Sequence, residues 1–114
     1  MSWKAVEREI ARRLGGARLP RTGYPTPDVL AGAFAVEVKA RRTLPGWFRD
    51  AMRQAVANAG DRIPVVVWHE SGNRYVNDIV CLRFADFITL LQDQEQEERH
   101  EDNEEPARPA ETGK

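Results

Sequence analysis

Two short apolar runs separated by a glycine place the strongest constraint on how this chain can fold. The runs cover about residues 28–31 and 34–40, and Gly32 offers the backbone freedom that a tight turn between them needs. They therefore predict a β-hairpin. Alternate side chains of a strand share one face, so Glu37 and Lys39 are expected side by side on an otherwise apolar strand.

A cluster of charged side chains is expected at one end of this hairpin. Pairing of the two strands would bring Asp28 near Glu37 and Lys39. Carboxylate oxygens suit a hard cation such as Mg²⁺, and a metal-bound water loses a proton more easily than free water. The three side chains therefore predict a metal-dependent hydrolytic site. The alternative is an exposed ion pair between Glu37 and Lys39, which would contribute little to stability.

A helix is predicted upstream of the hairpin, from the N-cap Ser2 to Leu14, where two glycines stop it. At helical spacing, Glu7 falls inside an apolar stripe formed by Trp3, Val6, Ile10 and Leu14. A carboxylate on a buried face is costly unless it is paired or bound to a metal. Glu7 is therefore a candidate site residue, with a salt bridge to a core arginine or lysine as the alternative.

The pattern Pro27-Asp28 followed by Glu37-Val38-Lys39 resembles the signature of the PD-(D/E)XK nuclease superfamily. The layout around it is most similar to that of archaeal-type Holliday junction resolvases and small phage nucleases. The resemblance covers roughly residues 2–67. It implies an α/β fold with a restriction-endonuclease-like core, in which helices flank a central mixed β-sheet of about five strands in the order α-β-β-β-α-β-β-α.

The resemblance also implies roles for individual residues. Glu7, Asp28, Glu37 and Lys39 would be the catalytic residues. Asp28, Glu37 and the backbone carbonyl of Val38 would hold Mg²⁺, for which Mn²⁺ would substitute, and Glu7 would reach the metal through water or complete a second site. Lys39 would orient or deprotonate the attacking water, or stabilise the transition state.

Basic side chains flank the expected site, and guanidinium groups hold phosphates without reading base sequence. We expect contacts to DNA from a set of five residues, namely Arg18, Arg21, Thr22, Arg41 and Arg42. Of these, Arg21 and Thr22 match a basic-hydroxyl loop of the resolvases. The implied partner is branched DNA, cut by a homodimer. A nuclease acting on ordinary duplex DNA and a DNA-binding protein with an inactive site are the alternatives.

The rest of the chain predicts further elements, namely strands at about 17–19, 63–69 and 75–82, and helices at about 47–59 and 84–91. The run 63–69 is apolar throughout, which is typical of a strand buried on both faces. Gln54 is either an accessory site residue or a surface glutamine. We expect Trp3, Trp68 and Cys81 in the core, whereas Trp47 and Phe48 belong to the core, a dimer contact or a DNA-stacking wedge.

The charge is distributed unevenly. Residues 93–114 carry nine acidic and three basic side chains, against nine acidic and fourteen basic ones in residues 1–92. We expect a nuclease domain at 1–91 and a disordered acidic tail at 92–114, which either aids solubility or screens the DNA-binding face. The single cysteine excludes an intramolecular disulfide. Without a visible signal peptide or membrane span, we expect an intracellular protein, in the cytoplasm or nucleoid of a prokaryotic or phage-infected cell.

Overall fold

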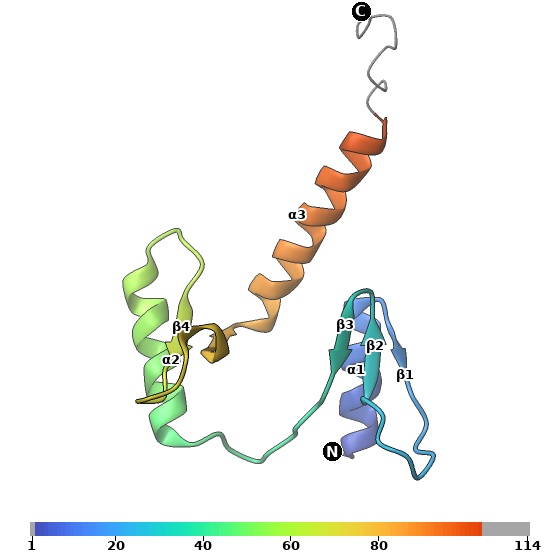
Figure 1. The fold of residues 1–114 in the computed structure, drawn as a ribbon, viewed down its shortest axis with the longest axis horizontal. Helices are drawn as coiled ribbons and strands as arrows, with labels where there is room; N and C mark the ends of the chain where they lie inside the picture. Colours follow the sequence, from blue (N-terminus) through green and yellow to red (C-terminus); the bar gives the residue numbers. More distant parts are fainter. Residues whose placement is uncertain (1, 104–114) are drawn as a thin grey trace, which may run out of the picture. The chain divides into compact units, whose positions relative to one another are not determined.

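The computed structural model describes residues 2–103 and has a mixed α/β architecture (Figure 1). This confirms the predicted fold class at its coarsest level. The chain divides into two compact units, residues 1–50 and 51–114. The strands form two antiparallel sheets, β1-β2-β3 in the first unit and β4-β5 in the second. A single central sheet of about five strands, and with it a restriction-endonuclease-like core, is therefore not confirmed.

Helix α1 (Trp3–Leu14) begins and ends where the sequence predicts. The Ser2 side chain accepts a hydrogen bond from the backbone N–H of Ala5 at 3.1 Å, and Gly15 closes the helix in the left-handed conformation. Gly16 has no room for a side chain, because a Cβ there would lie 2.2 Å from the carbonyl oxygen of Leu30. The helix therefore approaches strand β2 closely.

The first sheet consists of β1 (Ala17–Arg18), β2 (Val29–Ala31) and β3 (Phe34–Val36), and α1 lies against it (Figure 1). The predicted hairpin is present: β2 and β3 pair with Val29 opposite Val36. Gly32, with φ of 56°, begins the two-residue turn, as a type II′ turn requires. The buried apolar side chains between helix and sheet are Ala11, Val29 and Ala31.

Strand β3 is shorter than predicted, since it ends at Val36 and not at Ala40. The physical reason is that β2 begins at Val29, the partner of Val36, so the chain beyond has no strand to continue the ladder. Glu37 and Lys39 consequently lie in the segment without regular secondary structure that follows β3.

Helix α2 (Gly46–Ala59) begins in the first unit and continues into the second. The second sheet pairs β4 (Val65–Trp68) with β5 (Ile79–Leu82), after a 3₁₀ turn at Tyr75–Asn77. The prediction that residues 63–69 are buried on both faces is wrong, because Val65 and Val67 are exposed. Burial on both faces requires other elements packed on each face of the sheet, and the face that carries Val65 and Val67 is open to solvent.

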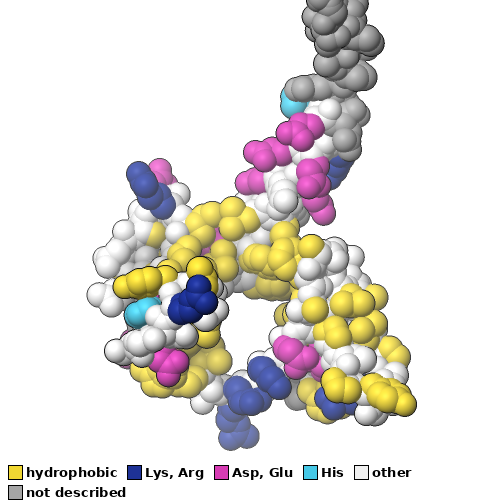
Figure 2. All heavy atoms as spheres, in the orientation of Figure 1, with side chains coloured by type: hydrophobic (Ala, Val, Ile, Leu, Met, Phe, Trp, Pro, Cys, Tyr) yellow, Lys and Arg dark blue, Asp and Glu magenta, His cyan; other side chains and the backbone are white. Residues whose placement is uncertain are grey.

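Helix α3 (Phe84–Asn103) starts where predicted but continues beyond the expected end at about Leu91. Its second half is rich in Glu and Gln, which are good helix formers, and Arg99 pairs with Glu95 one turn away at 3.8 Å. Figure 2 shows acidic side chains along this part of the helix. The remainder of the predicted tail, residues 104–114, lies outside the described residues. No helix in the described part is long and apolar enough to cross a membrane.

Candidate functional site

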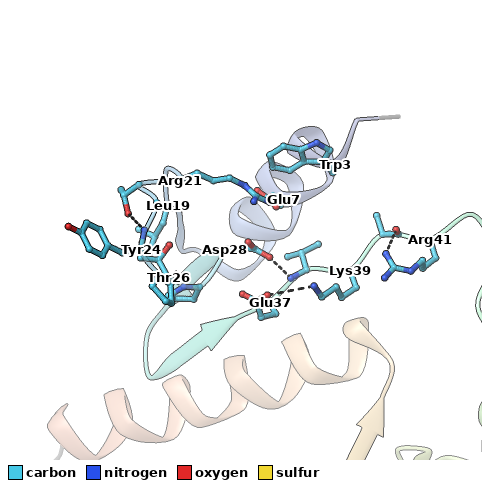
Figure 3. Close-up of a pocket in the computed structure, with 16 residues that line it drawn as sticks. Trp3, Glu7, Leu19, Arg21, Tyr24, Thr26, Asp28, Glu37, Lys39 and Arg41 are labelled. Carbon is cyan, nitrogen blue, oxygen red and sulfur yellow. Dashed lines mark hydrogen bonds and ion pairs between the residues drawn. The ribbon is translucent and has the colours of Figure 1, made fainter.

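A pocket of about 810 Å³ in the first unit gathers the principal residues that the sequence singles out (Figure 3). Its wall comes from α1, the loop between β1 and β2, and the segment after β3. It is lined by all four predicted catalytic residues, Glu7, Asp28, Glu37 and Lys39. Three of the predicted DNA-binding residues, Arg21, Thr22 and Arg41, line it as well, whereas Arg18, Arg42 and Gln54 do not.

Asp28 is held in place by the backbone around it. Its Oδ2 accepts a hydrogen bond from the N–H of Val38 at 2.8 Å. Its own N–H donates to the carbonyl of Val36, and its carbonyl accepts from the N–H of Leu19, both at 2.9 Å. Oδ1 takes part in no hydrogen bond within residues 2–103, so one carboxylate oxygen stays available in a fixed position.

Glu37 and Lys39 form an ion pair with 3.9 Å between Oε2 and Nζ, and their side chains are 59% and 70% exposed. At such exposure the pair contributes roughly 0–1 kcal/mol to stability. The exposed ion pair that the sequence left as the alternative is therefore present in the structure. Both side chains nevertheless line the pocket that contains Asp28, as the site interpretation expects.

Glu7 is only 5% exposed and is paired. Its Oε1 accepts a hydrogen bond from Nε of Arg18 at 2.8 Å, which links α1 to β1. The salt bridge to an arginine, which the sequence left as the alternative for Glu7, is thus present in the structure. It also occupies Arg18, one of the residues expected to contact DNA.

The carboxylates suit a hard cation in their chemistry, but their side chains do not form a coordination shell in this structure. Glu7, Asp28 and Glu37 supply the oxygen donors that Mg²⁺ prefers, and all three line one pocket. Across residues 2–103, however, no three Asp, Glu, His or Cys side chains lie close enough together to hold a metal ion. A bound cation would need these side chains to move closer together.

The pocket wall carries an aromatic–cation cluster that the sequence pattern did not predict. Trp3 was expected in the core, but it is 43% exposed and lines the pocket. The Arg21 guanidinium lies 4.7 Å from the centre of its ring, the Lys4 ammonium 5.5 Å and the Arg18 guanidinium 5.7 Å. Trp3 is the first residue of α1, and this position at the helix end is the sequence signal that its side chain need not be buried.

A second polar arrangement, in the second unit, also escaped prediction. Nδ1 of His69 lies 2.7 Å from Oδ1 of Asp78, and the imidazole ring stacks on Tyr75 with 4.6 Å between ring centres. These residues come from both ends of the loop that joins β4 to β5. Gln54, the accessory candidate, is exposed on α2 of the same unit.

Comparisons of this chain with protein-family models, curated proteins and solved structures find no match.

Proposed function

We propose that this protein is a metal-dependent DNA endonuclease of the PD-(D/E)XK type. The observation that carries the proposal is that Asp28, Glu37 and Lys39 line one pocket together with the cationic side chains of Arg21 and Arg41. Carboxylates that can hold a cation, beside cations that can hold a phosphate, are the combination that phosphodiester hydrolysis requires. Mg²⁺, once bound, would acidify a coordinated water and neutralise phosphate charge.

The chain's own residues would hold the cation, orient the substrate and neutralise the negative charge of its phosphate. Asp28, fixed by the N–H of Val38, offers its free oxygen to the cation, and Glu37 and the carbonyl of Val38 are the other proposed donors. The Lys39 ammonium, held near Glu37, can donate a hydrogen bond to a phosphate oxygen. Arg41 donates from Nη1 to the carbonyl of Ala40 at 3.0 Å, which leaves its other N–H groups for phosphate.

The finer proposal is a Holliday junction resolvase that acts as a homodimer, with a restriction-endonuclease-like core and a central mixed sheet. Two copies related by a two-fold axis would present two pockets to the two opposing strands of a junction. The proposal is supported by the PD-(D/E)XK pattern and by the excess of basic over acidic side chains in residues 1–92. Such an enzyme would work where the DNA is, in the cytoplasm or nucleoid.

A second candidate function is DNA binding without cleavage. Two observations favour it: Glu7 is already neutralised by Arg18, and the Glu37 side chain is exposed and paired with Lys39. A site in which the carboxylates stay with these partners would retain phosphate-binding cations without assembling a metal centre.

Cleavage of a labelled four-way junction and of a matched linear duplex, with Mg²⁺ or with EDTA, separates these functions. We expect the wild type to cut the junction symmetrically with Mg²⁺ only, and Asp28→Asn to bind it without cutting. Asp61→Asn, which changes an acidic residue outside the pocket, is the matched control and should cut normally. Equal cutting of both substrates would replace the resolvase by a general nuclease. Binding without any cutting by the wild type would favour the second candidate.

A further inference from the structure

We propose that Trp3 is a positioning residue, which holds Arg21 ready to bind a backbone phosphate of the nucleic-acid strand in the pocket. This inference rests on the proposed function, because it takes DNA as the ligand. It assigns a role to a side chain that sequence patterning placed in the core.

The geometry of the Trp3–Arg21 pair is that of a cation–π interaction. The Arg21 guanidinium lies 4.7 Å from the centre of the Trp3 ring, well within the range of a cation–π interaction. Figure 3 shows the Arg21 side chain reaching from its loop toward α1, which carries Trp3. A guanidinium held on an aromatic ring keeps N–H donors for a further partner, and a pair of them matches two phosphate oxygens.

The surroundings of Arg21 make Trp3 its principal anchor. Arg21 lies in the loop between β1 and β2, outside any helix or strand. Within residues 2–103, Arg21 forms no ion pair and its guanidinium donates no hydrogen bond. An unanchored arginine would lose side-chain freedom on binding a phosphate, and contact with the ring removes part of that cost beforehand.

The other two cations near the ring are less suited to this task. Arg18 is bonded through Nε to the buried Glu7, so it already has an anionic partner. Lys4 is exposed, and its ammonium is a flexible, strongly hydrated point charge. Arg21 is therefore the cation on Trp3 that has a planar donor edge and, in the described part of the chain, no carboxylate partner.

The pocket around Arg21 favours a strand of nucleic acid over a small anion. Lys39 and Arg41 line the same pocket as Arg21, so the pocket offers cations to more than one phosphate of a strand. Tyr24, which is exposed and follows Arg21 in the same loop, offers an aromatic face to an adjacent base or sugar.

The test is a double-mutant cycle on DNA affinity, measured by fluorescence anisotropy with a fluorescein-labelled duplex in EDTA. We expect Trp3→Leu to weaken binding about two- to fivefold, as the loss of one cation–π contact implies. In an Arg21→Gln background the same substitution should have no effect, because its target is gone. Trp3→Phe should retain most of the affinity. Tyr75→Leu, at an exposed aromatic residue in the second unit, is the matched control. It should leave the DNA affinity unchanged both with Arg21 present and in the Arg21→Gln background.

Two further measurements keep the proposal falsifiable. Arg21→Gln should reduce the slope of log K against log salt by about 0.9, the effect of one lost phosphate contact. In the free protein, NMR should show the Arg21 side-chain protons shifted upfield by the indole ring, and Trp3→Leu, checked for folding by its thermal melt, should abolish the shift.

Additive effects of Trp3→Leu and Arg21→Gln, an absent ring-current shift, or no DNA binding by the wild type would overturn the inference. DNA binding with the expected coupling but no Mg²⁺-dependent cutting would instead refute the nuclease and leave the inference standing.

Discussion

We expect that loss of Arg18 lowers the free energy of unfolding, by an amount that follows from the burial of its ion-pair partner Glu7. Glu7 is 5% exposed, so replacing Arg18 by methionine leaves a carboxylate in the core without its partner. Removing one partner of a buried pair costs roughly 3–5 kcal/mol. The Arg18 side chain is 23% exposed, which admits some water and places the expected loss at the lower end, about 3 kcal/mol.

Urea denaturation followed by circular dichroism measures this loss. The matched control is Arg12→Met, since Arg12 also pairs with a glutamate of α1, namely Glu9, but does so in solvent. This surface pair should contribute much less to stability than the buried pair, because solvent screens exposed charges. The double variant Glu7→Gln/Arg18→Met should recover part of the loss, because the orphaned group is then neutral.

The reasoning about burial would be refuted if Arg18→Met cost no more than Arg12→Met. It would also be refuted if the double variant were less stable than Arg18→Met alone.

Three other predictions concern the first unit. Asp28→Asn keeps an acceptor oxygen, so it should lower the unfolding free energy by less than about 1 kcal/mol while abolishing Mg²⁺-dependent cleavage; a variant that unfolds would show that Asp28 is structural. Hydrogen bonds from Arg12, with the larger effect, and from Arg13 lower the pKa of Glu9 from 4.5 to about 2. The stabilisation of α1 by the ionised Glu9 should therefore be present at neutral pH and be lost as pH falls from about 4.5 to about 2. An NMR titration midpoint of the Glu9 carboxyl near 4.5 would contradict this. Gly16→Ala should lower the unfolding free energy by about 1–3 kcal/mol, because its Cβ would meet the carbonyl of Leu30 at 2.2 Å; an unchanged thermal melt would refute that.

Where local signals determine the structure, the sequence was a good guide. The N-cap Ser2, the glycines after Leu14 and the turn at Gly32 act through their own backbone and nearest neighbours. Helix α1 and the β2–β3 turn appear where predicted, although β3 ends early. The partly buried positions of α2 are the apolar ones that helical spacing selects, namely Phe48, Ala51, Met52, Ala55 and Ala59.

Where the outcome depends on neighbours distant in the chain, sequence patterning failed. The run at Val65–Trp68 is apolar enough for a central strand, but its burial depends on how many strands and helices lie beside it. The end of β3 was set by the length of its partner, which the pattern within residues 34–40 does not contain. The pairing of Glu7 with Arg18 could be foreseen as one of two outcomes, because an acidic residue in an apolar stripe demands compensation of some kind.

The distribution of charge partners in the pocket constrains how it can work. Glu7 is compensated by Arg18 and Glu37 by Lys39, whereas Asp28 has no cationic partner among residues 2–103. If the proposed function holds, we expect a cation to bind first at Asp28, whose position the backbone already fixes. At the wall formed by Trp3 the balance is reversed, since Arg21 has no anionic partner among residues 2–103. Under the proposed function, Asp28 would therefore help to hold the cation, and Arg21 would bind a phosphate of the strand that is cut.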